Sequence, residues 1–176
     1  MGVIVTGSDT RMAAPATTHD FSTVYLANHR ALVGIARAAT GSWEAAEDLT
    51  HETFVKAWRG WDRIGGYDNP GAWLRLVLLH RVSSRWRSLG RERAAYGRVP
   101  ATAEAAPADA GIDDEFWAAV VTLPTQQRNV VLLHYADDQS VDDIAAVLGC
   151  SSGTVKTHLS RARQALATRL REGDAR

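Results

Sequence analysis

The residues best suited to bind a charged ligand lie in the stretch CSSGTVKTHLSRARQAL, from Cys150 to Leu166. Apolar side chains recur there at helical spacing and predict one buried face, made by Val155, Leu159, Ala162, Leu166 and Leu170. Small polar and basic side chains take the remaining surface: Lys156, Thr157, Ser160, Arg161, Arg163 and Gln164. Arginine and lysine suit phosphates and guanine edges, and short hydroxyl side chains permit close approach to a nucleic-acid backbone. The stretch therefore predicts a DNA-binding helix, with an ordinary solvated helix as the simpler alternative.

A shorter helix is predicted just before it, in SVDDIAAVLG. Ser140 is the expected N-cap with Asp143 three residues on, and Gly149 is suited to ending the helix. Ser151 or Ser152 then starts the longer helix. A short helix, a glycine turn and a basic helix in series are typical of helix-turn-helix proteins, whose second helix enters the major groove. The predicted DNA contacts are Ser152, Thr154, Lys156, Thr157, His158, Ser160 and Arg161.

A second candidate surface lies in GAWLRLVLLHRVSSRWR, from Gly71 to Arg87. On a helix, one stripe combines an aromatic ring with basic and small polar side chains: Trp73, Val77, His80, Ser84 and Arg87, with Arg81 beside it. Aromatic rings stack on unpaired bases and arginine neutralises phosphates, so the stripe suits single-stranded DNA. The opposing face predicts core residues: Leu74, Leu78 and Val82, with Leu79 and Trp86 at its edge. A plain core role for Trp73 is the alternative.

Charge is strongly segregated, although the 176-residue chain has a formal net charge of zero. Residues 71–98 contain seven arginines and one acidic residue, and residues 151–171 contain five basic residues and no acidic one. The acidic residues cluster elsewhere: Glu44, Glu47, Asp48 and Glu52, then Asp113, Asp114 and Glu115, then Asp137, Asp138, Asp142 and Asp143. This segregation predicts a polyanion for the basic surfaces and a different, basic partner for an acidic one.

The sequence gives no support to enzyme chemistry. It contains no metal-ligand spacing, glycine-rich phosphate loop or nucleophile motif, so we expect neither a catalytic site nor a cofactor. The single cysteine, Cys150, excludes an internal disulfide and fits a reducing compartment. A redox or metal-sensing role with His158 is the alternative to its packing as a small apolar residue, which is favoured. Because there is neither a bilayer-length apolar run nor a signal-peptide core, we expect a cytoplasmic protein without a membrane span.

Helical periodicity and breakers divide the chain and predict an all-α fold of two small helical domains joined by a flexible linker. The expected segments are a disordered lead-in (1–19), a first domain (20–88), an Ala- and Pro-rich linker (89–112), a second domain (113–171) and a tail (172–176). Within the first domain, Gly41 and Ser42 are expected to end one helix and begin the next. A loop is expected after Trp58, where GWDRIGGYDNPG is rich in breakers.

The second domain resembles region 4 of the extracytoplasmic-function (ECF) sigma factors, small members of the bacterial sigma-70 family. The resemblance rests on LPTQQRNVVL, SVDDIA and GTVKTHLSRAR, which occupy residues 123–132, 140–145 and 153–163. In that family, region 4 reads the −35 promoter element. The recognition helix taken alone is also similar to that of LuxR-type activators. A stand-alone helix-turn-helix transcription activator is therefore the alternative function.

The first domain resembles sigma region 2. EDLTHETFVKAW, residues 47–58, is similar to region 2.2, and its helix predicts a buried arc of Ala46, Leu49, Thr53, Phe54 and Ala57. The resemblance implies that the opposite side, with Asp48, His51 and Glu52, binds the β′ clamp helices of core RNA polymerase. The run WLRLVLLHRVSSRWR, residues 73–87, is similar to regions 2.3 and 2.4, which implies −10 recognition, with base capture at a loop near residues 64–69. His80 and Ser84 replace the usual asparagine and aspartate, so the −10 preference is not carried over.

Together these resemblances imply an ECF sigma factor that directs promoter-specific transcription initiation. Such a protein binds core polymerase, recognises the −35 and −10 elements and promotes strand opening. The implied partners are core RNA polymerase through its β′ clamp helices and the β flap, promoter DNA in double- and single-stranded form, and an anti-sigma factor.

Overall fold

The computed structural model describes residues 18–95 and 112–174, and every regular element in these two ranges is helical. The first unit comprises α1 (Phe21–Thr40), α2 (Trp43–Arg59), α3 (Trp61–Ile64) and α4 (Pro70–Ala95). The second unit comprises α5 (Ile112–Val121), α6 (Thr125–Val131), the π-helical turn η1 (Leu132–Ala136), α7 (Val141–Leu148) and α8 (Ser152–Asp174). The all-α prediction is confirmed. The predicted lead-in except its last two residues, the linker residues 96–111 and the last two tail residues lie outside the described ranges.

The boundary between α1 and α2 follows the predicted capping residues. Gly41 takes a left-handed conformation with φ of 71°, which glycine adopts without steric cost, and its N–H donates to the Arg37 carbonyl. The Ser42 side chain then accepts a hydrogen bond from the Ala45 amide at 3.2 Å. These two residues set the turn that lays α2 against α1.

The helix-turn-helix is capped in the same way. Ser140 accepts from the Asp143 amide at 3.1 Å, and Gly149 closes α7 in a left-handed conformation with φ of 64°. The Thr154 amide donates to the Ser151 hydroxyl at 3.1 Å, so Ser151 and not Ser152 caps α8. Local sequence signals therefore fix both ends of the turn between α7 and α8.

Replacing Ser140 with alanine is expected to lower the free energy of unfolding by about 1 kcal/mol, because the first turn of α7 loses its cap. Urea denaturation of the two proteins measures the difference. Ser160→Ala is the matched control, since Ser160 lies exposed in the interior of α8 and should change stability by less than about 0.5 kcal/mol. Equal losses in the two variants would contradict the capping role.

Two elements extend beyond the sequence prediction. Helix α4 continues through residues 89–95, which were expected to begin the linker. Arginine, glutamate and alanine dominate that extension and are strong helix formers, so the sequence there favours a continued helix. The short helix α3 lies inside the expected loop after Trp58, and the Trp61 indole donates to the His19 carbonyl at 3.0 Å.

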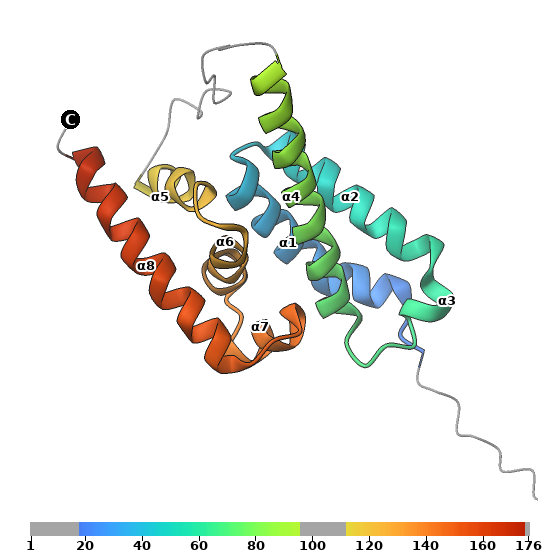
Figure 1. Ribbon diagram of the computed structural model, residues 1–176. Helices are drawn as coiled ribbons and strands as arrows, with labels where there is room; N and C mark the ends of the chain where they lie inside the picture. Colours follow the sequence, from blue (N-terminus) through green and yellow to red (C-terminus); the bar gives the residue numbers. More distant parts are fainter. Residues whose placement is uncertain (1–17, 96–111, 175–176) are drawn as a thin grey trace, which may run out of the picture.

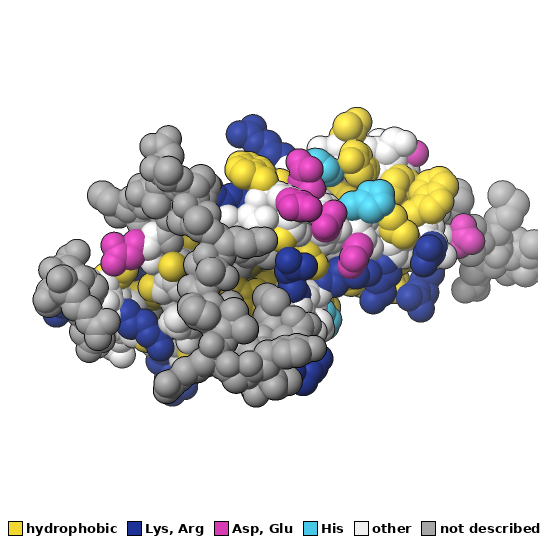
Figure 2. All heavy atoms as spheres, turned by 90° about the horizontal axis from the view of Figure 1, so that it is seen from above, with side chains coloured by type: hydrophobic (Ala, Val, Ile, Leu, Met, Phe, Trp, Pro, Cys, Tyr) yellow, Lys and Arg dark blue, Asp and Glu magenta, His cyan; other side chains and the backbone are white. Residues whose placement is uncertain are grey.

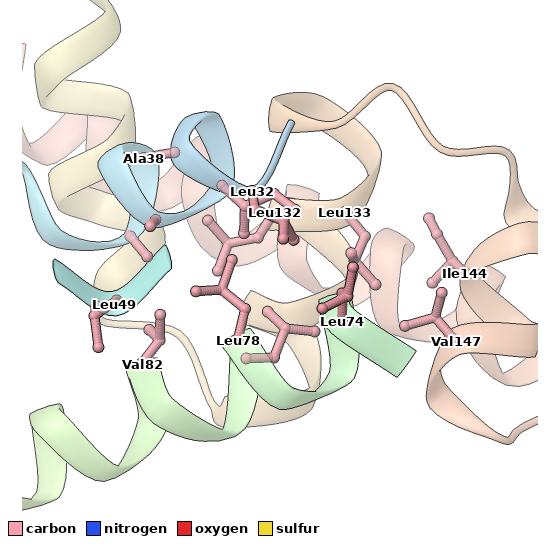
Figure 3. Packing of buried hydrophobic residues seen from close by; sticks show 14 of the residues in the cluster. Leu32, Ala38, Leu49, Leu74, Leu78, Val82, Leu132, Leu133, Ile144 and Val147 are labelled. Atoms are coloured by element: carbon pink, nitrogen blue, oxygen red, sulfur yellow. The ribbon is translucent and has the colours of Figure 1, made fainter. Parts of the chain in front are cut away.

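The two units are packed against each other and share one hydrophobic core. Helix α6, η1 and α7 lie between α8 and the first unit (Figure 1). Leucines of α1 and α4 meet apolar side chains of η1 and α7 in this core: Leu32, Leu74 and Leu78 with Leu132, Leu133, Ile144 and Val147 (Figure 3). A smaller cluster lies within the second unit alone and contains Val120, Leu123, Val131, Ala162 and Leu166. The sequence predicted the two units but not their contact.

Candidate nucleic-acid and protein interfaces

Helix α8 presents a polar and basic face to solvent. Its predicted apolar face is confirmed, because Val155, Leu159, Ala162 and Leu166 are buried and Leu170 is half-buried. The side chains on the other side are exposed: Lys156, Thr157, Ser160 and Arg161. Contacts with α5, α6 and α7 hold the helix on the second unit. These four side chains are thus displayed from a rigid support, as a major-groove reader requires.

Of the three other predicted DNA contacts on α8, Ser152 and His158 are partly covered and Thr154 is exposed. The Ser152 hydroxyl donates to Asp142 of α7 at 2.5 Å and is half-buried, so it ties the two helices together. His158 is half-buried, and its Nδ1 atom is buried without a hydrogen-bond partner. Thr154 is exposed, with its hydroxyl 2.9 Å from that of Ser151. The arrangement concentrates the candidate DNA surface on the turns that follow.

The predicted stripe on α4 is only partly displayed. His80, Ser84 and Arg87 are exposed, and the Arg87 guanidinium donates to the Ser84 hydroxyl at 3.0 Å. Trp73 is half-buried and packs against the shared core. Val77 is only 6% exposed, so little of its side chain is available to DNA, and its role as a DNA contact stays a prediction. Helix α2 covers Val77, because this side chain lies on the α4 surface that faces α2. The opposing core face is confirmed for Leu74, Leu78, Leu79 and Val82.

A shallow hollow between α2 and α4 brings the two candidate surfaces of the first unit together. Its lining is mixed in character: Leu49, Glu52, Lys56, Val77, His80, Arg81, Ser84 and Arg85. Across it, the Arg81 guanidinium forms a salt bridge with Glu52, although the sequence assigned these residues to different partners. Lys56 and Arg85 were not predicted as site residues. Their signal was present, because each lies four residues after a predicted one on the same helix face.

The outer face of α2 is acidic and borders exposed hydrophobic side chains. Asp48, His51 and Glu52 are all exposed, and the predicted buried arc of α2 is confirmed. Trp58 of the same helix is 63% exposed. In the view from above, acidic and histidine side chains lie next to a group of hydrophobic ones (Figure 2). Acidic groups beside exposed aromatic and aliphatic surface are typical of a protein-binding face.

Two polar contacts cross between the units and were not predicted. Arg75 of α4 forms a bidentate salt bridge with Asp137, which follows η1. The Arg128 guanidinium of α6 lies over the Trp86 ring of α4, 4.8 Å from its centroid. Burial lowers the pKa of Arg128 from its ordinary value, and one of its N–H groups donates to the Val121 carbonyl at 3.2 Å. Trp86 was predicted at the edge of the core face of α4. From that position its ring contacts Arg128 of the second unit.

Cys150 is half-buried and packs against the shared core, as a small apolar residue does. Within residues 18–95 and 112–174, no cluster of three or more His, Cys, Asp or Glu side chains is placed to hold a metal ion. None of the helices in those ranges combines the length and apolar character needed to cross a membrane.

Comparison with known protein families matches both units. The family model for sigma-70 region 2 matches residues 24–92, and that for sigma-70, region 4 matches residues 113–166. The chain is 34% identical over 142 residues to the ECF RNA polymerase sigma factor EcfG of Rhodopseudomonas palustris, covering 79% of this chain and 78% of that protein. It is 29% identical over 153 residues to the RNA polymerase sigma-E factor of Streptomyces avermitilis, covering 82% and 81%.

Two solved structures share the arrangement of helices. The sigma factor RpoE of Bartonella quintana, in complex with the anti-sigma factor NepR, matches with a TM-score of 0.68 and 33% identity. That match covers 86% of this chain and 97% of the other. CnrH in complex with the cytosolic domain of CnrY matches with a TM-score of 0.60 and 25% identity, covering 86% and 88%.

Proposed function

Because the chain belongs to the ECF group of the sigma-70 family and is an RNA polymerase sigma factor, we propose that its two units divide promoter recognition between them. The second unit, as region 4, reads the −35 element with α8. The observation that supports this is the exposed face of Lys156, Thr157, Ser160 and Arg161 on a capped helix-turn-helix. Its basic side chains suit phosphates and guanine edges, and its hydroxyl side chains suit close backbone contacts.

The first unit, as region 2, binds the −10 element along α4. His80, Ser84 and Arg87 offer exposed polar contacts, and Lys56 and Arg85 add positive charge on the rim of the hollow between α2 and α4. Trp73 provides an aromatic edge near the start of the helix. Stacking an unpaired base returns about 1–3 kcal/mol, comparable with the few kcal/mol needed to unstack it. Binding energy and not a chemical step therefore drives strand opening, and the protein is not itself an enzyme.

The acidic face of α2 is the proposed contact with core polymerase. Asp48, His51 and Glu52 would meet a basic surface on the β′ clamp helices, and Trp58 of the same helix would supply buried apolar area at the margin. Engagement of Glu52 by a basic residue would compete with its salt bridge to Arg81. Arg81 would then be released toward DNA, which links polymerase binding to −10 binding.

An anti-sigma factor is a further proposed partner. In one similar solved structure the sigma factor RpoE is bound to the anti-sigma factor NepR, and in another CnrH is bound to the cytosolic domain of CnrY. Each match covers 86% of this chain. We place the protein in the cytoplasm, where polymerase and promoter DNA are found. The stand-alone activator alternative gains no support, since residues 24–92 match sigma-70 region 2.

Run-off transcription tests the function directly. Core polymerase, which lacks a sigma factor, should produce a defined transcript from the DNA upstream of this protein's own gene only when the protein is added. An activator would instead act only in the presence of a holoenzyme that already contains another sigma factor. Transcription that depends on such a holoenzyme would contradict the proposal.

A further inference from the structure

We propose that the salt bridge between Arg75 and Asp137 is an intramolecular latch that holds the two promoter-binding units closed and must open before both elements can be bound. The inference rests on the proposed division of −10 and −35 binding between the units. It assigns a regulatory role to two residues that lie outside the predicted DNA and polymerase surfaces.

The bridge is buried, and four of the five N–H groups of the Arg75 guanidinium donate hydrogen bonds. Arg75 Nε donates to Asp137 Oδ2 at 2.5 Å, and Nη2 donates to Oδ1 at 3.1 Å. Arg75 Nη1 donates to the Asn28 side chain at 2.8 Å and to the Gly71 carbonyl at 3.1 Å. The side chains of Arg75 and Asp137 are only 12% and 3% exposed. A buried, bidentate ion pair constrains the relative position of its two elements far more strongly than a surface ion pair does.

The backbone around Asp137 directs its carboxylate toward Arg75 of α4. It follows the π-helical turn η1, a rare element that often lies at functional positions. The next residue, Asp138, has a left-handed φ of 51°, a conformation that aspartate tolerates better than most residues. The Gln139 amide donates back to the Leu133 carbonyl at 3.0 Å and closes the bend. This irregular segment points Asp137 away from its own unit and into the first one.

Apolar packing surrounds the latch and gives the closed form its stability. The leucines of α1 and α4 meet η1 and α7 in the shared core, and the Arg128 guanidinium stacks over Trp86 farther along α4. The charged pair adds specificity to this contact, because any other register would leave Arg75 or Asp137 buried without a partner.

The closed form is too short to occupy both promoter elements. The −35 and −10 positions are nominally about 25 base pairs apart, which is roughly 85 Å of B-DNA at about 3.4 Å per pair. A single compact body of this chain's length has a radius of gyration of about 16 Å. The units must therefore separate when the promoter is engaged, and separation breaks the Arg75–Asp137 bridge. When the units separate, both charged side chains are hydrated again. Neither charge is then left buried without its partner, so the folded protein can break the pair without that cost.

The test compares two neighbouring isosteric changes, Asp137→Asn and Asp138→Asn. Each removes one negative charge, but only the first unpairs the buried Arg75 guanidinium. We expect Asp137→Asn to raise the radius of gyration of the full chain, measured by small-angle X-ray scattering, at unchanged helix content by circular dichroism. Core polymerase would engage the two units at separate sites, the β′ clamp helices and the β flap, so it too would favour separated units. The Kd of the variant for core polymerase should therefore fall by about threefold to tenfold, because the open form is more populated. Asp138→Asn should match wild type in both measurements.

A second variant is expected to change core-polymerase affinity in the opposite direction. Arg75→Met combined with Asp137→Leu removes both charges and keeps an apolar contact, so the closed form should persist and core polymerase should bind more weakly than to wild type. Wild-type size and affinity in Asp137→Asn would overturn the latch. If Asp137→Asn instead loses helix content, the double variant decides, and wild-type core affinity in it would overturn the proposal. Scattering and core binding need no promoter, so a failed run-off assay would count against the proposed function and not against the latch.

Discussion

Replacing Asp48 and Glu52 with alanine is expected to weaken binding of core RNA polymerase by about tenfold to a hundredfold while the protein stays folded. Both side chains are exposed on α2, and the residues that hold this helix lie on its other side. A tenfold to hundredfold loss corresponds to about 1.4–2.8 kcal/mol for the two side chains together. That total is within the range observed when charged interface side chains are truncated. Fluorescence anisotropy with labelled protein and core polymerase measures the Kd, and circular dichroism checks the fold.

Two controls separate the polymerase contact from other effects. Glu115→Ala removes an exposed acidic side chain from α5 and should leave the Kd unchanged. Asp48→Ala alone leaves the Glu52–Arg81 salt bridge in place, so its effect cannot come from a freed Arg81. Unchanged affinity in the double variant would remove α2 from the proposed polymerase interface.

Changing Lys156 and Arg161 together to alanine is expected to lower affinity for promoter duplex by about tenfold to a thousandfold. Each basic side chain that contacts a phosphate contributes about one unit to the slope of log K against log salt, and a bidentate guanine contact contributes about 1–3 kcal/mol. Anisotropy titrations of duplex DNA from the protein's own upstream region at several salt concentrations measure both quantities. We expect the salt slope to fall by up to about two units.

Arg169→Ala is the matched control for this experiment. Arg169 is also an exposed basic residue of α8, but it lies far from the N-terminal turns that reach the bases in a helix-turn-helix. It should lose much less affinity than the double variant. If Lys156→Ala combined with Arg161→Ala binds like wild type, α8 is not the recognition helix.

Most of the local structure could be predicted from the sequence. Gly41, Ser42, Ser140 and Gly149 end or begin helices where they were expected to, because capping depends on residues within one turn of each other. The apolar faces of α2 and α8 were predicted for the same reason, since a 3.6-residue period determines which side chains share a face. The helix-turn-helix and its exposed basic surface are therefore properties of the sequence alone.

Contacts between distant residues were decided only by the tertiary structure. Arg75 and Asp137 are 62 positions apart, and Arg81 and Glu52 are 29 apart, so no helical period relates them. Val77 is another example. The sequence predicted which stripe of α4 it belongs to, but not that α2 covers it. A helix's own pattern says which residues lie side by side on its surface. Which surface is then covered, and which charge meets which, depends on how the helices pack, and here that packing joins both units in one core.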